Sequence, residues 1–456
     1  MGWTTKIAME GGGFRPAVLS LAVGLMLAGV GDSRAQRQAG DEWAGKAVVP
    51  KTRNFTIRVG ERGIESRGRP AIYHVDRVNG PSLLISTPGQ SGWVSSASVV
   101  PLDQAGTFFS SQIRANPRES FNHAMRAIVL LSGKPDVDRA LADVNEAVRL
   151  DPHSVTALIL RASIWADRKE YDRAIADYSE VIRHDPMVFP AYFGRAAVQG
   201  EKGDYDKAIA DLDKVIGLDP RLPDSYLVRA VGWKHKKEYD KAIADLNEAI
   251  RLDPRSAAAY HDRGLLYSDK KQYDKAIADF SEAIRLEPAK ASGYCNRGFA
   301  WKAEKEYDNA VADFTEAIRL DPRDSDAYCG RGWARQEKKD HAKALADFDQ
   351  ALRLDSRDAC ALDGRGWIWA TSPDATVRDG KKAVEAAIEA CELTRWRETY
   401  CLETLAAGYA EVGDFAAAVK WQTKAIELET DPSLLEEYRP RLKLYQDKKP
   451  FRDTKP

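Results

Sequence analysis

The stretch that decides the fold spans residues 253–288 and reads DPRSAAAYHDRGLLYSDKKQYDKAIADFSEAIRLEP. Its two prolines, Pro254 and Pro288, lie 34 residues apart. Prolines recur at this interval along the chain, at Pro152, Pro186, Pro220, Pro254, Pro288 and Pro322. A fixed period of this length indicates stacked copies of one supersecondary unit, in which each copy packs on its neighbours.

Each period contains two runs of residues with helical spacing. In the quoted copy these runs are marked by Tyr260, Gly264 and Tyr267, and by Ala276, Phe280 and Ala283. Apolar and small residues at such intervals share one face of a helix, so each run predicts an amphipathic helix. The polar run at residues 270–274 predicts the turn between them. Pro288 ends the second helix, because the residue before a proline disfavours helical geometry.

The aromatic, glycine, tyrosine, alanine and proline places of this unit resemble those of the tetratricopeptide repeat, over roughly residues 105–432. The resemblance implies a mainly α fold, an α-solenoid in which about nine helix pairs wind into a right-handed superhelix. The eighth unit departs from the period, since residues 371–380 lengthen its turn by about five residues. Residues 433–456 are expected to form a capping helix and a tail, because the end of a repeat array otherwise exposes apolar surface.

Residues 1–35 have the features of a secretory signal. Lys6 and Arg15 lead into an apolar run at residues 17–30, and small residues before the predicted cleavage point, after Ala35, suit the peptidase. We therefore expect an exported protein, periplasmic or extracellular, without a membrane span once the signal is removed. An uncleaved anchor and a misassigned start are the alternatives.

Residues 41–104 differ in composition from the repeats. Short runs rich in β-branched and aromatic residues, at 47–49, 55–59, 71–75 and 83–85, are separated by Gly, Pro and Asn and predict strands. Five short strands in about sixty residues favour a small all-β barrel. The stretch 91–101, with its Gly-Trp-Val and Val-Val runs, resembles the end of a bacterial SH3-like domain. Related domains imply a second contact, to cell-wall material.

An arginine recurs before the small residue of the first helix, where the tetratricopeptide family usually has leucine. An aspartate recurs in the second helix, and we expect the two side chains to form an ion pair across each helix pair. The predicted pairs are Arg161 with Asp177, Arg195 with Asp211, Arg229 with Asp245, Arg263 with Asp279, Arg297 with Asp313, and Arg331 with Asp347. The alternative is a ladder of arginines that binds a ligand.

The inner, concave face of the array is where the tetratricopeptide family usually binds peptides. We expect the candidate peptide groove to include Phe193, Leu265, Phe299, Trp333 and Trp367. Aromatic side chains in a concave site suit recognition of an extended or helical segment. The alternative, equally open from the sequence, is that these side chains pack between neighbouring first helices.

The other polar residues form no motif for catalysis or ligand binding. The seven histidines are scattered, and neither a phosphate-binding loop nor a nucleophile elbow occurs. We therefore expect no enzyme activity, no cofactor and no metal. Among the five cysteines, Cys391 and Cys401 flank a turn and are the candidate disulfide in an oxidising compartment. Lys and Arg number 68 against 69 Asp and Glu, so we expect no general attraction to nucleic acid.

The sequence thus predicts an exported, non-enzymatic scaffold that binds a protein or peptide through the concave face of the solenoid. Two alternatives stay open. One is a structural envelope component that assembles with itself. The other is an accessory subunit of an envelope enzyme, acting through the lengthened turn and the nearby Trp367, Trp369 and Trp396.

Overall fold

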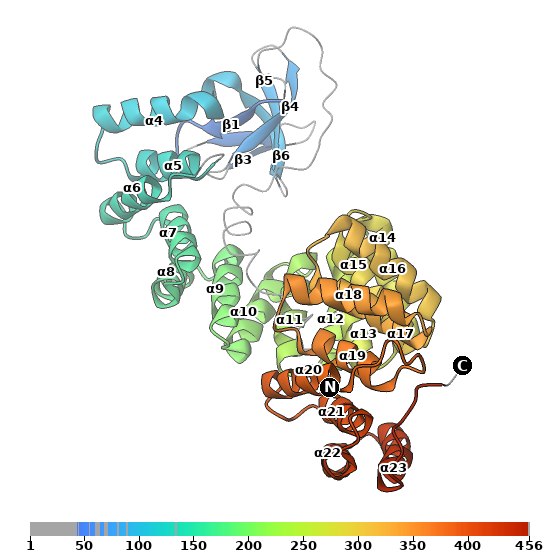
Figure 1. The fold of residues 1–456 in the computed structure, drawn as a ribbon. Helices are drawn as coiled ribbons and strands as arrows, with labels where there is room; N and C mark the ends of the chain where they lie inside the picture. The colour runs from blue at the N-terminus through green and yellow to red at the C-terminus, as the bar shows by residue number, and fades with distance from the viewer. Residues whose placement is uncertain are drawn as a thin grey trace. The chain divides into compact units, whose positions relative to one another are not determined.

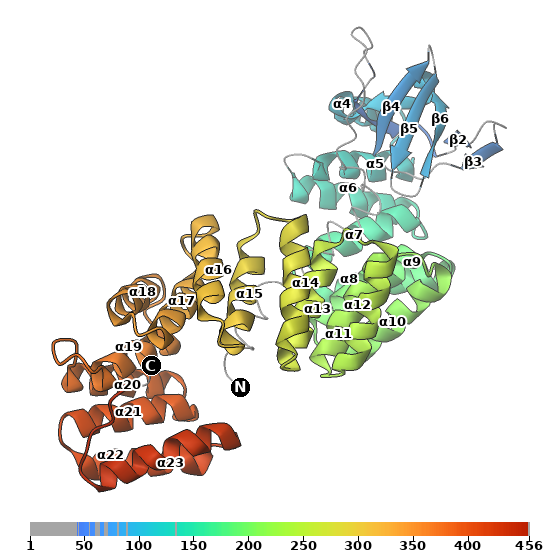
Figure 2. The same ribbon diagram turned by 90° about the vertical axis from the view of Figure 1, so that its right-hand side faces the viewer.

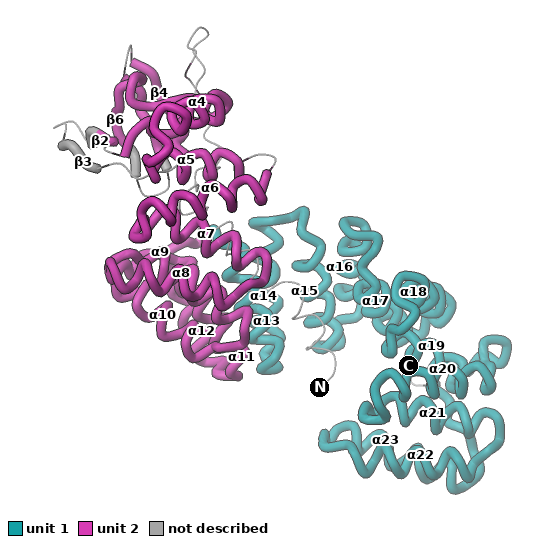
Figure 3. The backbone as a smooth tube through the Cα atoms, turned by 90° about the vertical axis from the view of Figure 1, so that its left-hand side faces the viewer, with its two compact units in different colours: residues 1–8, 255–456 teal, residues 9–254 magenta. Residues whose placement is uncertain are grey.

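The computed structural model describes residues 43, 45–53, 55–59, 64–67, 72–79, 82–87, 90–132 and 135–454. The predicted signal segment, residues 1–35, lies outside them. The described residues fall into two compact units, of which one ends at Pro254 and the other begins at Arg255 (Figure 3). A search of the described helices for a stretch long and apolar enough to cross a membrane finds none.

The first unit begins with a small antiparallel sheet (Figure 1). Its strands are β1 (Ala47–Pro50), β2 (Thr56–Val59), β3 (Ile64–Arg67), β4 (Tyr73–Asn79), β5 (Ser82–Thr87), β6 (Gln90–Ser95) and β7 (Val99–Pro101). They pair in the order β3-β2-β6-β5-β4-β1-β7. The expectation of five strands was wrong, because the seven include β3, whose polar sequence gave no strand signal, and a separate three-residue β7. Pairing of β3 with β7, which would close the predicted barrel, is absent among the described residues.

Alternation along the strands builds the core of this sheet. In β4, Tyr73 and Val75 are buried while His74 and Asp76 are partly exposed, and in β5 Leu83 and Ile85 repeat the pattern. The register sets Leu83 opposite Val94 of β6, so buried side chains meet across neighbouring strands.

The sheet continues into the helices without a linker. Strand β7 ends at Pro101 and helix α4 (Leu102–Ala115) begins at the next residue. Val49 and Val100 of the sheet share one apolar cluster with Phe109 of α4 and Ile128 of the following helix. The sheet and the first repeats of the unit are therefore joined by a common core.

Nine helix pairs follow α4 in the described part of the chain. The first unit contains α5 (Ser120–Leu131) with α6 (Val137–Leu150), α7 (Val155–Asp167) with α8 (Tyr171–His184), α9 (Phe189–Glu201) with α10 (Tyr205–Leu218), and α11 (Pro223–His235) with α12 (Tyr239–Leu252). The second unit contains α13 (Ala257–Asp269) with α14 (Tyr273–Leu286), α15 (Ala291–Ala303) with α16 (Tyr307–Leu320), α17 (Ser325–Glu337) with α18 (His341–Leu354), α19 (Ala359–Thr371) with α20 (Gly380–Leu393), and α21 (Thr399–Glu411) with α22 (Phe415–Leu428). Helix α23 (Pro432–Gln446) packs on the last pair, where a capping helix was predicted (Figure 2). The expected mainly α fold of stacked helix pairs behind a small β domain is confirmed.

Each pair is held together by a small residue in the first helix and a large one in the second. Phe280 of α14 is fully buried against Gly264 of α13, where an added Cβ would lie 2.8 Å from the ring. Gly332 stands in the same relation to Phe348 two units away, at 2.7 Å. A methyl group would overlap the ring in both places, so the missing side chain is what allows close helix packing.

The turns within most pairs are three residues long, as between α17 and α18, where they span residues 338–340. The middle residue has a left-handed backbone, with φ of 64° at Lys305 and 65° at Lys339, and glycine takes the same place at Gly203 with φ of 83°. In the eighth pair residues 372–379 separate the helices, which matches the predicted insertion of about five residues.

The structure places all six predicted Arg–Asp pairs in contact, each with two hydrogen bonds. For Arg297, Nε and Nη2 lie 2.7 and 2.8 Å from the two carboxylate oxygens of Asp313. The third nitrogen of this guanidinium, Nη1, donates to Ser281 of the preceding second helix at 2.9 Å. The aspartate side chains are mostly buried, and those of the arginines less so. One arginine therefore joins three helices and fixes the offset between successive pairs.

We predict that Arg297→Met lowers the free energy of unfolding by about 3 kcal/mol, because Asp313 is then left as a buried charge without its partner. Urea unfolding followed by circular dichroism measures the change. The double variant Arg297→Met with Asp313→Leu should recover most of the loss, since both charges are gone. Arg285→Met is the matched control, because the Arg285–Glu282 pair lies on the exposed face. Equal stability of Arg297→Met and the control would contradict the assigned role.

Asp363 is a buried carboxyl group in α19, at the place that Cys295 and Cys329 occupy in earlier units. Burial raises its pKa to about 8, and a hydrogen bond with Thr404 opposes that rise. In the unfolded chain the same group titrates near its usual value of 3.8. Folding therefore takes up a proton between about pH 4 and pH 8, and stability falls as the pH rises through that range.

Thermal unfolding should show this dependence. We expect the second unit to melt at a lower temperature at pH 8 than at pH 5, with a loss of at most about 1.4 kcal/mol per pH unit from this one proton. Asp363→Asn keeps the shape of the side chain and should flatten the dependence. A pH profile that is the same in the variant and in the parent chain would show that Asp363 is not its source.

Candidate peptide-binding face

The predicted groove residues lie in different surroundings. Phe193 is only 3% exposed and packs in α9 against Leu212 and Val215 of α10. The expectation that it lines the groove was wrong, because its helical register turns it toward the partner helix. Leu265, Phe299, Trp333 and Trp367 lie in successive first helices of the second unit. We call the surface formed by α13, α15, α17, α19 and α21 the first-helix face.

The aromatic rings on this face also pack against other helices, both within a helix pair and between pairs. Phe299 meets Phe314 edge-on at 4.9 Å between ring centres, and Trp333 meets Phe348 at 5.6 Å. The indole Nε1 of Trp333 lies 3.0 Å from the Sγ of Cys360 in the next first helix. Both rings are half-buried, so each ring packs on neighbouring helices with one edge and is exposed to solvent at the other.

Trp367 is covered by a segment from outside the repeats. Its side chain is 8% exposed, and the ring of Phe451 lies 5.8 Å from it, centre to centre. The guanidinium of Arg441, from α23, lies 5.1 Å from the Trp367 ring and 4.7 Å from the Phe451 ring. Arg441 is in turn paired with the buried carboxylate of Glu403 on α21. Phe451 therefore occupies a slot formed by the ring of Trp367 and the guanidinium of Arg441, and the ion pair with Glu403 fixes that guanidinium in place.

The covering residues belong to a stretch after α23, residues 447–454, which we call the tail segment. From Pro450 to Thr454 it has no helix or strand. It runs past the C-terminal ends of three first helices, since it contacts Gln336 near the end of α17, and Thr371 and Glu411, the last residues of α19 and α21.

Asp453 is the polar anchor of the tail segment. Its carboxylate accepts hydrogen bonds from the Nζ of Lys339 at 2.6 Å and from the Nε2 of Gln336 at 2.8 Å. Its backbone N–H donates to the carbonyl of Thr371 at 2.9 Å. The last carbonyls of a helix lack partners within the helix, so this bond satisfies one of them.

Arg452 makes the complementary contact. Its Nη2 lies 2.5 Å from Glu411, whose other oxygen pairs with Arg378 of the lengthened turn at 3.0 Å. Arg378 also donates to the carbonyl oxygens of Ser372 and Pro373. The lengthened turn of the eighth pair therefore helps to build this site.

Burial shapes the electrostatics of the site. It lowers the pKa of Arg441, although an arginine stays charged at any physiological pH. It raises the pKa of Glu337, and the nearby charge of Asp453 raises it further. The site thus holds an aromatic slot, a basic contact at Lys339 and an acidic contact at Glu411.

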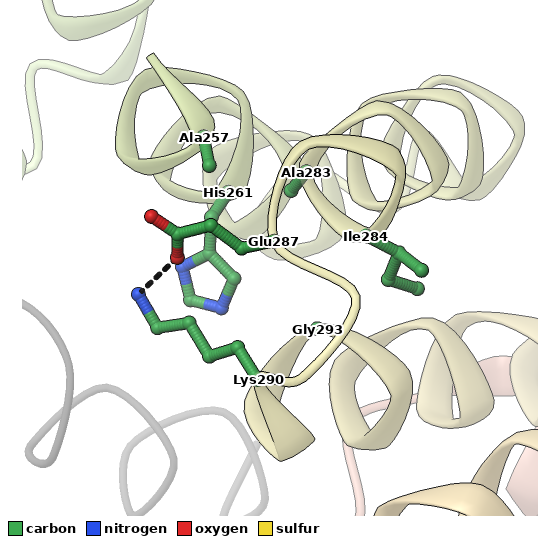
Figure 4. A pocket seen from close by; sticks show the side chains of 7 residues that line it. All are labelled: Ala257, His261, Ala283, Ile284, Glu287, Lys290 and Gly293. Atoms are coloured by element: carbon green, nitrogen blue, oxygen red, sulfur yellow. Dashed lines mark ion pairs between the residues drawn. The ribbon is translucent and has the colours of Figure 1, made fainter. Parts of the chain in front are cut away.

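A separate small pocket lies between α13, α14 and the start of α15 (Figure 4). His261 projects toward it, while Glu287 and Lys290 pair with each other at 3.4 Å. The Nε2 of His261 lies 2.8 Å from the side-chain nitrogen of Asn296. The other lining residues are Ala257, Ala283, Ile284 and Gly293. The polar groups are engaged with one another, so the pocket presents no acid–base pair to a substrate.

Within the described part of the chain, two groups of residues have donor atoms close enough for a metal ion. In the first, His153, Glu180 and His184 come together, and their meeting was not foreseen from the scattered histidines. The Oε1 of Glu180 faces both histidines, and the guanidinium of Arg183 already contacts this oxygen at 2.6 Å. His184 takes the place held by leucine at Leu218 and Leu252, so a comparison of the repeats could have marked it.

The second group contains Cys329, Asp358 and Cys360, whose two sulfur atoms lie 3.0 Å apart. Burial raises the pKa of both thiols, which favours the protonated form over the metal-binding thiolate. Cys391 and Cys401, the pair considered from the sequence, are buried free thiols in the structure.

The tryptophans considered for an enzyme site are not gathered into one cluster. Trp369 lies under the Arg365 and Lys382 side chains, whereas Trp396 stacks on Trp421 at 5.0 Å. The sequence predicted a tail after the capping helix but not its contacts with the first helices. Its only signal was an aromatic residue after a charged, aperiodic run, at residues 447–451.

Comparisons with known proteins agree with this fold. Family models described as TPR repeat or tetratricopeptide repeat match residues 133–186, 170–223, 235–271, 257–289, 291–324 and 325–358. A search of curated proteins finds no significant match.

Solved structures give partial similarities. The crystal structure of MamA protein is 25% identical, with 38% of this chain and 94% of that chain covered and a TM-score of 0.35. YrrB, described as a TPR protein with an unusual peptide-binding site, is 20% identical, with coverages of 41% and 95% and a TM-score of 0.36. Yeast Tom70 is 15% identical, with coverages of 76% and 92% and a TM-score of 0.40. The matched segments, read with the helix pairs of the structure, identify the chain as a tetratricopeptide-repeat protein.

Proposed function

We propose that the chain is an exported, non-enzymatic scaffold that binds a protein or peptide through its first-helix face. The observation that carries the proposal is the tail segment, because a stretch of polypeptide without helix or strand already lies on that face. It is held there by one aromatic, one acidic and one basic side chain. A surface that holds one extended segment in this way has the chemistry to hold another.

Repeat arrays supply a long, preformed surface, which suits a scaffold. On the first-helix face the indole of Trp333 contacts Cys360 and the carboxylate of Glu411 pairs with Arg378, and neither contact joins a nucleophile to a base. Binding therefore explains the face better than catalysis does.

Export is the second part of the proposal. It is supported by the basic lead and apolar run of residues 1–35. The small β domain adds a separate contact, for which cell-wall material is the proposed ligand on the strength of its resemblance to SH3-like domains.

N-terminal sequencing tests export. When the full sequence is expressed in a bacterial host, we expect the chain in the exported fraction with Gln36 as its first residue, because the signal peptidase cuts after Ala35. A chain that stays in the cytosol and begins at Met1 would refute this part of the proposal.

A peptide-display selection tests binding. Selected peptides should bind the chain, and Lys302→Glu with Trp333→Leu should weaken them at least fivefold, because both residues lie on the first-helix face beside Phe299 or Cys360. Lys275→Glu, in second helix α14, is the matched control and should leave binding unchanged. Peptides that bind the double variant as well as they bind the parent chain would place recognition elsewhere.

A further inference from the structure

The tail segment is not needed to close the end of the repeat array. Helix α23 already covers the last pair, with Tyr438 and Tyr445 at most 1% exposed. Phe451, Arg452 and Asp453 stay partly exposed by comparison, with 28% of the Arg452 side chain and 12% of the Asp453 side chain exposed. The tail segment therefore lies on the outside of a repeat array whose end α23 already covers.

The surface beneath the tail segment is supported without it. Arg441 is fixed by Glu403, and Glu411 is fixed by Arg378. Trp367 is anchored by its own helix and packs beside Ala383 and Ala407. These contacts remain if the tail segment leaves, so the slot and the acidic contact are preorganised for an occupant.

The contacts of the tail segment define what the surface recognises. Phe451 and Asp453 are two residues apart in a stretch without helix or strand. They meet α19 and α17 respectively, while Arg452 between them meets α21. The recognised pattern is thus an aromatic residue followed two places later by an acidic one, with a basic residue between them.

We propose that the ends of α17, α19 and α21 form a binding site for an extended peptide of a partner protein with the pattern aromatic–basic–acidic, and that the tail segment is its resident competitor. This inference rests on the proposed function, of which it specifies the ligand. A partner must displace the tail segment to bind. A tethered segment acts at an effective concentration on the order of millimolar, so partners with weaker or mismatched contacts are excluded.

A labelled peptide tests the proposal. The probe is a synthetic peptide with the sequence of residues 447–454, and its binding is measured by fluorescence anisotropy. The full chain should bind it weakly, because only the fraction with an empty site is competent. The variant Phe451→Ala with Asp453→Ala vacates the site in the full chain, and we expect it to bind the peptide at least tenfold tighter.

A second substitution shows whether binding is at this site. In the vacated variant, Lys339→Glu should weaken the peptide at least tenfold, because it places a negative charge against the peptide's aspartate. Lys305→Glu is the matched control, since Lys305 holds the same left-handed turn position one unit earlier and is exposed. Melting curves establish that both variants are folded. Peptides with alanine at the aromatic or the acidic place should bind poorly.

The outcomes distinguish a failure of the tail-segment site from a failure of the proposed scaffold function. Equal binding by the parent and the vacated chain, or equal effects of Lys339→Glu and Lys305→Glu, would overturn the tail site. If display-selected peptides then still bind the first-helix face, the scaffold function stands alone. If no peptide binds the vacated chain, both proposals fail. A mass that rises with concentration in the parent chain and not in the vacated variant would show that the tail segment sits in a second copy, and would overturn its role as competitor within one chain.

Discussion

The buried ion pair between a first-helix arginine and a second-helix aspartate is the constraint on which the repeats depend. A stack of helix pairs has only contacts between neighbours, so its register has to be fixed locally at every step. The planar fork of Arg297 meets both oxygens of Asp313 while its third nitrogen reaches Ser281, which is possible at one offset of the three helices. Desolvation of the charges offsets much of their attraction, so the pair contributes more to the accuracy of the stack than to its stability.

This ladder stops where the candidate site begins. Arg365 of α19 has Ala386 at the place of the expected aspartate, and it pairs with Asp349 of the preceding pair. In the last unit Leu405 and Trp421 replace both members. The turn of α19 and α20 can lengthen here because no bidentate pair ties the two helices together. That longer turn supplies Arg378, which holds Glu411 for the tail segment. The repeat that lacks the bidentate Arg–Asp pair is thus also the repeat whose longer turn contributes Arg378 to the recognition surface.

Periodicity explains how much was predictable. The helix pairs, the insertion in the eighth turn and the capping helix could be predicted because the same pattern of residues recurs several times in one chain. The number of strands did not follow, since β3 reads IESR and offers no alternation to recognise. The groove was predicted only in part. Phe193 was expected in the groove, whereas the structure shows it packed on Leu212. The tail segment could not be placed at all, because a contact between Asp453 and Lys339 spans an aperiodic stretch whose path no spacing encodes.

The position of the tail segment also has a physical consequence for the chain itself. Without Phe451, the indole of Trp367 and the guanidinium of Arg441 would face solvent beside the half-buried ring of Trp333. Exposed aromatic patches of this kind promote nonspecific association. A resident segment hides the patch and lets only an occupant with matching contacts uncover it. Because the aromatic slot alone would accept many peptides, the basic contact at Lys339 and the acidic contact at Glu411 decide which of them can compete. Selectivity at such a site therefore comes from the contacts that a partner must replace, as much as from those it makes.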